Sequence, residues 1–120
     1  MASITTDGSI EPHPRMLDVA GSSLRGTFLA TYNQLREAFG EEDTPGESHP
    51  EWTILMEMNP DEAPNQRASI YPSAGVGDIR LLPNKVMPWH VGGYCDSFKQ
   101  DGRRTTLAER ISSTLARPPQ

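Results

Sequence analysis

Two short segments of the chain hold the side chains best able to do chemistry. The first, Trp89-His90-Val91-Gly92-Gly93, places an imidazole just before two residues without side chains. An imidazole can exchange a proton or hydrogen-bond a phosphate, and adjacent glycines let another group approach the backbone closely. That group is a ligand, a partner chain or another strand of the same fold, and the residues alone do not choose among the three.

The second segment, Gly102-Arg103-Arg104-Thr105-Thr106, comes immediately before a capping box that opens the last helix. Guanidinium groups grip phosphate through paired hydrogen bonds, and the N-terminus of a helix adds further donors. The segment therefore indicates an anion site. The alternative is that both arginines are solvated or pair with nearby carboxylates such as Asp96 and Asp101.

Taken together, the two segments predict a ligand site with a phosphate contact, a glycine surface and a side chain against the base or ribose. Its residues are Arg103, Arg104 and Thr106; Gly92 and Gly93; and His90 or Tyr94. No motif supplies His90 with a carboxylate, nucleophile or metal at a recognisable spacing, so no catalytic residue is expected. Cys95 and the scattered histidines do not form a ligand-like pair, and neither a metal nor a cofactor is expected.

The elements that must position these residues follow the order β-α-β-β-β-α. Capping residues and apolar periodicity predict strands at 24–29, 52–58, 67–71 and 89–94, and helices at 31–40 and from Thr106 to Pro118. This order favours an α+β fold, with a small, mainly antiparallel sheet and two helices on one face.

The remaining segments are expected to lie outside this core. Residues 1–20 predict a flexible arm that contributes little core, 21–117 a single domain and 118–120 a tail. Residues 41–51, with five carboxylates and no basic side chain, predict a solvated loop. Ile79, Leu81 and Leu82 indicate a short edge strand inside an irregular stretch at 72–88.

Length, charge and cysteine content narrow the class of protein. The 120 residues suit one domain, and the net charge of −5 argues against a general nucleic-acid binder. Residues 1–66 carry a net charge of −9 and residues 67–120 a net charge of +4. This division indicates two solvated faces, a basic part that meets an anionic ligand, or an acidic part that mimics nucleic acid in a partner's basic groove. A single cysteine fits a reducing cytoplasm, and no apolar run suits a signal peptide or membrane span.

Several short matches in fixed order resemble a group of small proteins encoded by bacteriophages and prophages. The resemblance covers residues 24–98 and is carried by Leu24-x-Gly26-Thr27-x-x-Ala30-Thr31-Tyr32-x-x-Leu35, Phe39-Gly40-Glu41, Glu51-Trp52, Ala68-x-Ile70-Tyr71 and Trp89-His90-Val91-Gly92-Gly93. Such proteins often oppose bacterial immunity by inhibiting CRISPR effectors or sequestering cyclic nucleotide signals. The chain is similar in size to the Thoeris anti-defence proteins, oligomeric sponges for cyclic ADP-ribose variants. It departs from many relatives in the length of Pro72–Pro88, and no family site is carried over.

The resemblance implies an anti-defence protein in the cytoplasm of the host bacterium, which binds a nucleotide-like small molecule as a homo-oligomer. One alternative is an inhibitor that binds a CRISPR or other defence protein through an acidic surface built on Glu41, Glu42 and Asp43. Another is a nucleotide-degrading enzyme with His90 as acid or base. Neither direct nucleic-acid binding nor membrane association is expected.

Overall fold

The computed structural model describes residues 1–13, 19–43, 49–73 and 79–116. They form the α+β fold with two α-helices that the sequence predicts. Their strands make one six-stranded sheet and a separate two-stranded sheet, where the sequence predicts a single small sheet. Among the described strands of the large sheet, only β1 (Ala2–Ile4) and β4 (Trp52–Met56) run parallel to each other. The other neighbours are antiparallel, so the sheet is mainly antiparallel.

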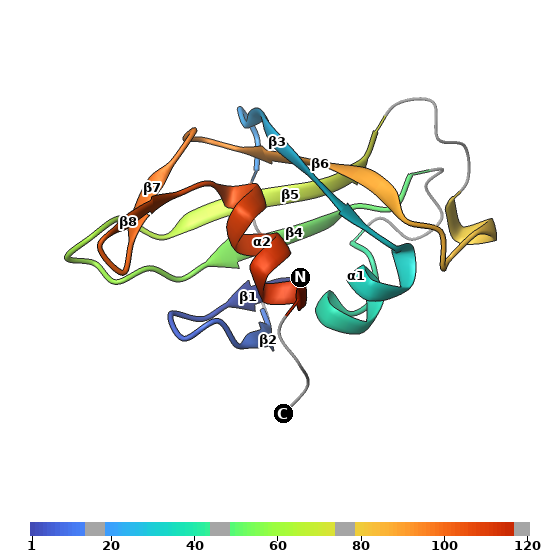
Figure 1. Cartoon of the computed structure of the whole chain (residues 1–120), viewed down its shortest axis with the longest axis horizontal. Helices are drawn as coiled ribbons and strands as arrows, with labels where there is room; N and C mark the ends of the chain where they lie inside the picture. The colour runs from blue at the N-terminus through green and yellow to red at the C-terminus, as the bar shows by residue number, and fades with distance from the viewer. Residues whose placement is uncertain (14–18, 44–48, 74–78, 117–120) are drawn as a thin grey trace.

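The strands of the large sheet lie in the order β2, β1, β4, β5, β6, β3 (Figure 1). The remaining bounds are β2 Ile10–Pro12, β5 Gln66–Pro72, β6 Met87–Gly93 and β3 Ser23–Ala30. The predicted succession appears as β3, α1 (Tyr32–Phe39), β4, β5, β6 and α2 (Leu107–Ala116), with additional elements before β3 and between β5 and α2. The sheet therefore joins residues that are far apart in the sequence.

Side chains alternate across the sheet as the period of the sequence predicts. Trp52, Ile54 and Met56 point into the core from β4, and Trp89 and Val91 do so from β6. The rings of Trp52 and Trp89 meet edge to face, with centroids 5.7 Å apart. Both tryptophans are therefore core residues, as expected.

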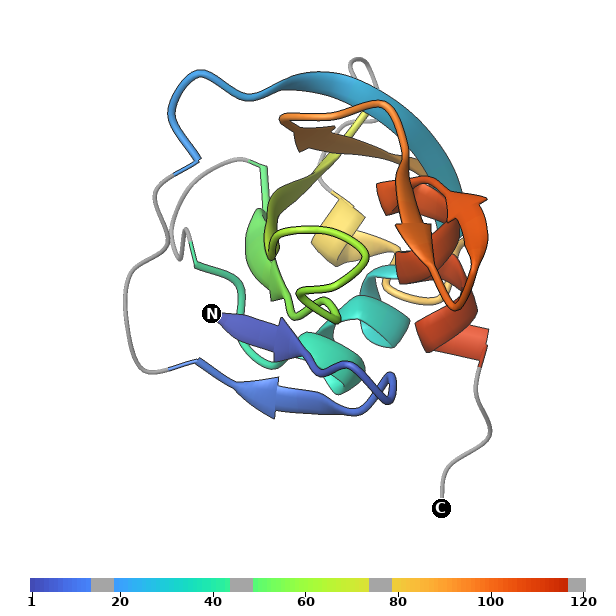
Figure 2. The same ribbon diagram turned by 90° about the vertical axis from the view of Figure 1, so that its left-hand side faces the viewer.

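The two helices fill the concave side of the curved sheet (Figure 2). Helix α1 (Tyr32–Phe39) begins with the predicted capping box, in which the Thr31 hydroxyl accepts from the Gln34 N–H, and ends at Gly40, whose φ is 84°. Helix α2 is Leu107–Ala116. Both helices thus bury one apolar face against the same face of the sheet, through Tyr32, Leu35, Phe39, Leu107 and Ile111.

The predicted flexible arm is wrong for the described N-terminal residues. Strand β1 lies between β2 and β4, with Ile4 opposite Met56. Ala2 and Ile4 are buried in the core, and β2 folds back on β1 through the turn at 5–9. Three-residue strands are too short to show a period, which is why the sequence does not reveal them. Residues 14–18, and the predicted tail at 118–120, lie outside the described residues.

Two further segments differ from expectation. Ile79–Leu81, predicted as an edge strand, forms a single turn of 3-10 helix, η1, in which the Leu82 N–H donates to the Ile79 carbonyl. Ile79 alone is buried there, so no alternating face exists to pair as a strand. After β6, strands β7 (Phe98–Gln100) and β8 (Arg103–Thr105) form a small hairpin that the sequence does not predict.

Candidate functional site

His90 lies on the convex face of the sheet, opposite to its neighbours Trp89 and Val91. Its imidazole meets the Tyr71 ring edge to face, with centroids 5.4 Å apart. Among the described residues it forms neither a hydrogen bond nor an ion pair, and no carboxylate orients it. The geometry therefore gives His90 an aromatic neighbour but none of the partners that acid–base catalysis needs.

The two glycines of β6 make room for the chain's own side chains. A Cβ on Gly93 would lie 2.2 Å from Leu107 Cδ1, and one on Gly92 would lie 2.6 Å from Ser69 Oγ. Both positions are buried. The sequence leaves open whether a ligand, a partner chain or another part of the same fold approaches the two glycines. In the structure, side chains of the same fold do so.

Tyr94 is also held by the chain itself. Its hydroxyl donates to the Ala20 carbonyl at 2.7 Å, and the Arg67 guanidinium lies 5.5 Å from its ring centroid. The ring is 38% exposed. Tyr94 therefore keeps some accessible aromatic surface, but its hydroxyl already has an acceptor.

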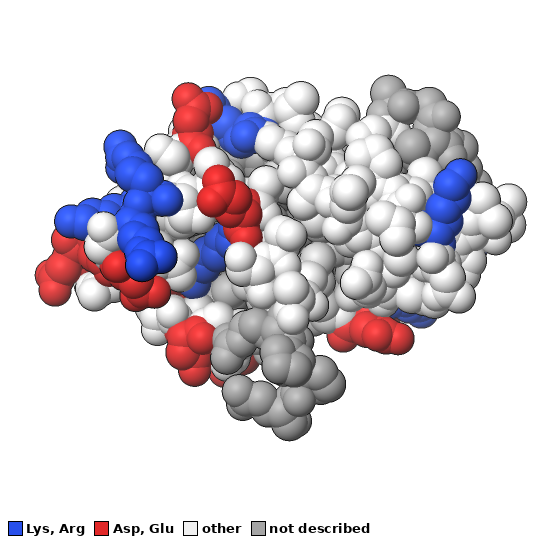
Figure 3. Space-filling view, viewed as in Figure 1, with Lys and Arg blue, Asp and Glu red and all other residues white. Residues whose placement is uncertain are grey.

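Arg103 and Arg104 lie on β8 of the small hairpin, not at the start of a helix. Arg103 opposes Gln100 and Arg104 opposes Lys99, and both arginines and Lys99 are exposed. Figure 3 shows the basic cluster at this end of the molecule, beside acidic side chains. The sequence reading missed Lys99, because a cross-strand neighbour becomes visible only when the hairpin is known.

Thr106 caps α2, as the sequence predicts. Its hydroxyl accepts from the Glu109 N–H at 3.1 Å and lies 3.2 Å from the Glu109 carboxylate. One donor at this helix N-terminus is thus already used inside the chain. The expected anion site at the N-terminus of the helix is therefore less open than its sequence suggests.

A polar cavity of about 480 Å³ lies between the β1–β2 turn, the β7–β8 hairpin and α2. We call it the hairpin cavity. Its walls carry hydroxyls, an amide, two carboxylates and one guanidinium, from Thr6, Asp7, Gly8, Gln100, Asp101, Thr105, Arg110, Ser113 and Thr114. Thr105 connects it to the two predicted arginines, whereas His90 and Tyr94 do not line it.

Arg110 is the most unusual residue of this cavity, because it is only 5% exposed, whereas arginine is rarely buried without an ionic partner. Its guanidinium donates to the Thr5 carbonyl at 2.8 Å and contacts Met58 Sδ at 2.7 Å. Among the described residues, no carboxylate lies within ion-pair distance of it. Burial lowers the pKa of Arg110, while the more distant Asp101 and Glu57 partly oppose that shift.

The sequence contains a signal that Arg110 is buried, namely its position on the apolar face of α2. This signal is easily missed because a charged residue is normally expected to be exposed. The buried positions of α2 are 107, 108, 110, 111 and 114, so Arg110 lies on the apolar face of the helix. A charged residue at such a spacing indicates a buried polar contact. Arg110 therefore belongs among the candidate site residues, although the sequence-based prediction places it only within a helix and assigns it no role.

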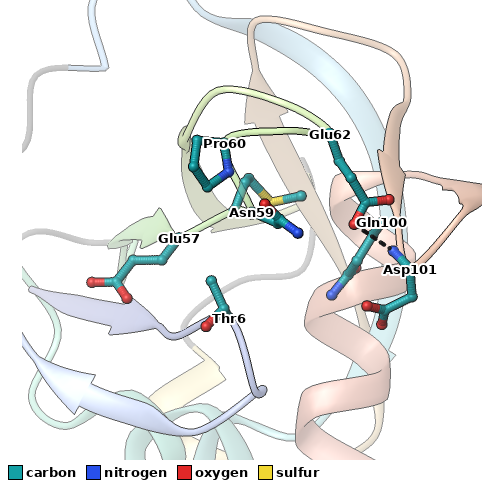
Figure 4. Close-up of a pocket in the computed structure, with 8 residues that line it drawn as sticks. Thr6, Glu57, Asn59, Pro60, Glu62, Gln100 and Asp101 are labelled. Carbon is teal, nitrogen blue, oxygen red and sulfur yellow. Dashed lines mark hydrogen bonds between the residues drawn. The ribbon is translucent and has the colours of Figure 1, made fainter.

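An adjoining cavity of about 330 Å³ is lined largely by acidic and amide side chains (Figure 4). It shares Thr6, Gln100 and Asp101 with the hairpin cavity. The Glu62 carboxylate accepts from the backbone N–H groups of Asp101 and Gly102, at 3.2 and 2.9 Å. Glu62 thereby ties the hairpin to the β4–β5 loop and fixes the wall between the two cavities.

The acidic segment 41–51 is not simply a solvated loop. Glu42 is buried, accepts from the Tyr32 hydroxyl at 2.5 Å and pairs with Arg80 Nε at 2.7 Å. Asp43 accepts from the backbone N–H and hydroxyl of Thr53, at 2.7 and 2.8 Å. Glu47 lies outside the described residues. Two carboxylates of the proposed acidic surface are therefore committed to internal contacts, and only Glu41 of that set is exposed.

These contacts also change proton affinities. Burial and the hydrogen bond to Glu42 raise the pKa of Tyr32. Burial raises the pKa of Glu51, and the charge of Asp43 raises it further. Carboxylates of the segment 41–51 therefore interact electrostatically with other groups of the fold.

The chain matches no family model, no curated protein and no solved structure. No helix formed by the described residues has the length and apolar character needed to cross a membrane. The part of the chain that the structure describes contains no cluster of three or more His, Cys, Asp or Glu side chains suited to a metal ion. The function must accordingly be argued from the geometry of the site.

Proposed function

We propose that the protein is a non-enzymatic binding protein that takes up a nucleotide-derived small molecule in the hairpin cavity. The observation that carries the proposal is Arg110, a buried guanidinium that lines this cavity and has no ion-pair partner among the described residues. A buried charge is costly unless it is paired, so an anionic group in the cavity would offset that cost.

The remaining walls suit the other parts of such a ligand. The volume lies within the range of small-molecule sites. Gln100 can hydrogen-bond a base edge, and the carboxylate of Asp101 can accept from ribose hydroxyls. Arg103 shares a face of β8 with Thr105 and opposes Gln100, so it supplies exposed positive charge for phosphate beside the cavity. Arg104 adds exposed positive charge on the opposite face of the same strand.

Binding is favoured over catalysis because His90 lies on the convex face without an orienting group. A protein-binding inhibitor is less well supported, because Glu42 and Asp43 are held by internal contacts. Together with the resemblance to small phage proteins, these observations support a protein that withholds a cyclic nucleotide or cyclic ADP-ribose variant from a defence effector in the host cytoplasm.

Calorimetry of the full chain with a panel of cyclic nucleotides and ADP-ribose cyclisation products tests the proposal. Replacing both Arg103 and Arg104 by Ala should weaken binding by roughly ten- to hundredfold, the range for lost charged hydrogen bonds. Gln100→Ala should weaken binding without removing a buried charge. Arg110→Met should abolish phosphate-dependent binding, and its circular dichroism spectrum reports whether it is folded.

His90→Ala is the matched control, because it changes a predicted site residue that does not line the cavity. It should bind as the wild type does. Absence of heat with every ligand at protein concentrations well above micromolar would refute the proposed function. Equal losses in the His90 and Gln100 variants would refute the location of the site.

A further inference from the structure

Strand β3 forms an unpaired edge of the large sheet, and α2 packs beside it at Gly26, where an added Cβ would lie 3.1 Å from Ala108 Cβ. As the described residues form the sheet, β6 pairs with one side of β3 and no strand pairs with the other. β3 has eight residues, contains no proline and carries a single charged side chain, Arg25. The opposite edge, β2, has three residues and includes Glu11 and Pro12. Short length, charge and proline protect an edge against pairing, and β3 lacks most of these features.

The free edge of β3 borders a hollow on the side of α2. A cavity of about 700 Å³ lies between residues 25–29 of β3 and α2, to which the helix side contributes Thr106, Ala108, Glu109, Ser112 and Ser113. Leu24 and Leu29 are 55% and 69% exposed on the same strand. Figure 3 shows a broad uncharged area over β3, with acidic side chains at its border near the start of α2. Backbone groups, apolar side chains and space thus occur together along one edge.

A bulge gives this edge an internal symmetry. In the ladder with β6, Gly26 opposes Val91 whereas Leu24 opposes Gly92, so Arg25 is the extra residue. A β-bulge of this kind shifts the alternation by one residue. Leu24 therefore shares the convex face with Thr27 and Leu29, and the two leucines flank Thr27 at matching distances along the strand.

We propose that β3 pairs antiparallel with β3 of a second copy of this chain, about a two-fold axis at Thr27. In this register Thr27 faces Thr27 of the second copy, Gly26 faces Phe28, and Leu24 faces Leu29 on both sides of the axis. Directly opposed residues then share a face, as antiparallel pairing requires. The two exposed leucines of each copy cover those of the other in one isologous interface.

The charges around β3 fit a second copy of the chain. Salt screens charges that lie more than about 8–10 Å apart, so two molecules that each carry −5 associate most readily where their contact region is close to neutral. The only charge on β3, Arg25, is bound to the Asp96 carboxylate at 2.8 Å and donates to the Gly93 carbonyl at 3.2 Å. As the bulge residue it faces no residue of the second strand, so no like charges meet across the axis.

Sedimentation velocity of the full chain over a concentration series, up to about 100 μM, tests the association. The wild type should form a dimer. Leu29→Glu should weaken that dimer at least tenfold, because two carboxylates are then placed against two leucines. Leu81→Glu is the matched control, since Leu81 is 77% exposed but lies on η1, and it should dimerise as the wild type does. A monomeric wild type, or equal losses in both variants, would overturn the proposal.

The register has its own tests. Leu24→Glu combined with Leu29→Lys should restore the dimer, because opposite charges then face each other twice. In a Cys95→Ser background, Thr27→Cys should form a symmetric disulfide on oxidation, whereas Leu29→Cys should not, because it faces Leu24 of the second copy. If the charge pair does not restore the dimer and the Thr27→Cys disulfide does not form, the register is overturned, and the two-fold axis with it. None of these outcomes depends on the hairpin cavity or its ligand.

Discussion

A substitution at Gly93 tests whether the glycines at 92 and 93 make room for the fold's own side chains or for a ligand. The missing Cβ of Gly93 makes room for Leu107, since a Cβ there would lie 2.2 Å from Leu107 Cδ1. Carbon atoms pack best at about 3.5–4.0 Å, so Gly93→Ala demands a displacement of more than an ångström. Leu107 is 1% exposed, so its methyl group can move away only by displacing the side chains packed around it. Overpacking of this kind costs about 1–3 kcal/mol of unfolding free energy.

A double-mutant cycle by urea denaturation identifies the cause. Leu107→Ala alone should destabilise the protein by about 2–5 kcal/mol, as a buried leucine truncation does. In that background Gly93→Ala should cost almost nothing, because the clashing methyl group is absent. Gly26→Ala supplies a milder comparison, with Ala108 Cβ at 3.1 Å from the new Cβ. The reasoning is refuted if Gly93→Ala costs the same in both backgrounds, or if it leaves stability unchanged while it abolishes ligand binding.

Three further substitutions follow from the contacts of the fold, each measured by urea denaturation. Thr106→Ala removes the cap of α2 and should cost about 1 kcal/mol, and an unchanged midpoint would count against the cap. Glu42→Gln breaks a buried pair with Arg80 and should cost about 1–3 kcal/mol, whereas exposed Glu41→Gln should cost almost nothing; equal effects would contradict the internal role of Glu42. Burial raises the pKa of Glu51 above its unfolded value, so its stabilising contribution is present below the unfolded pKa and is lost as the pH rises through the folded pKa. The wild type should therefore lose stability relative to Glu51→Gln as the pH rises through and above the usual titration range of a glutamate, and parallel pH profiles would argue against the shift.

The sequence predicts those elements whose signals are local. The capping box of Thr31 and Gln34 marks the start of α1, and the alternation of Trp52, Ile54 and Met56 identifies the buried face of β4. Both signals lie within a few residues of the element that they define, so they do not depend on distant parts of the chain.

The rest depends on contacts between distant segments. Ile4 becomes a core residue because β1 lies beside β4, which begins about fifty residues later. Gly93 acquires its role only when Leu107 of α2 packs over β6. The predicted ligand site failed to assemble for the same reason, since His90 and Arg103 are near in sequence but occupy different sheets.

Strand β6 also limits how early in synthesis the large sheet can form, because β3 pairs with it. Its residues pair with β5 on one side and with β3 on the other, so Trp89 lies between Pro72 and Phe28. Because sixty residues separate Phe28 from Trp89, β3 must wait through most of synthesis for its only ladder among the described strands. Until β6 arrives, β3 has two free edges, and substitutions in the Trp89–Gly93 segment should therefore slow folding and promote aggregation in addition to lowering stability.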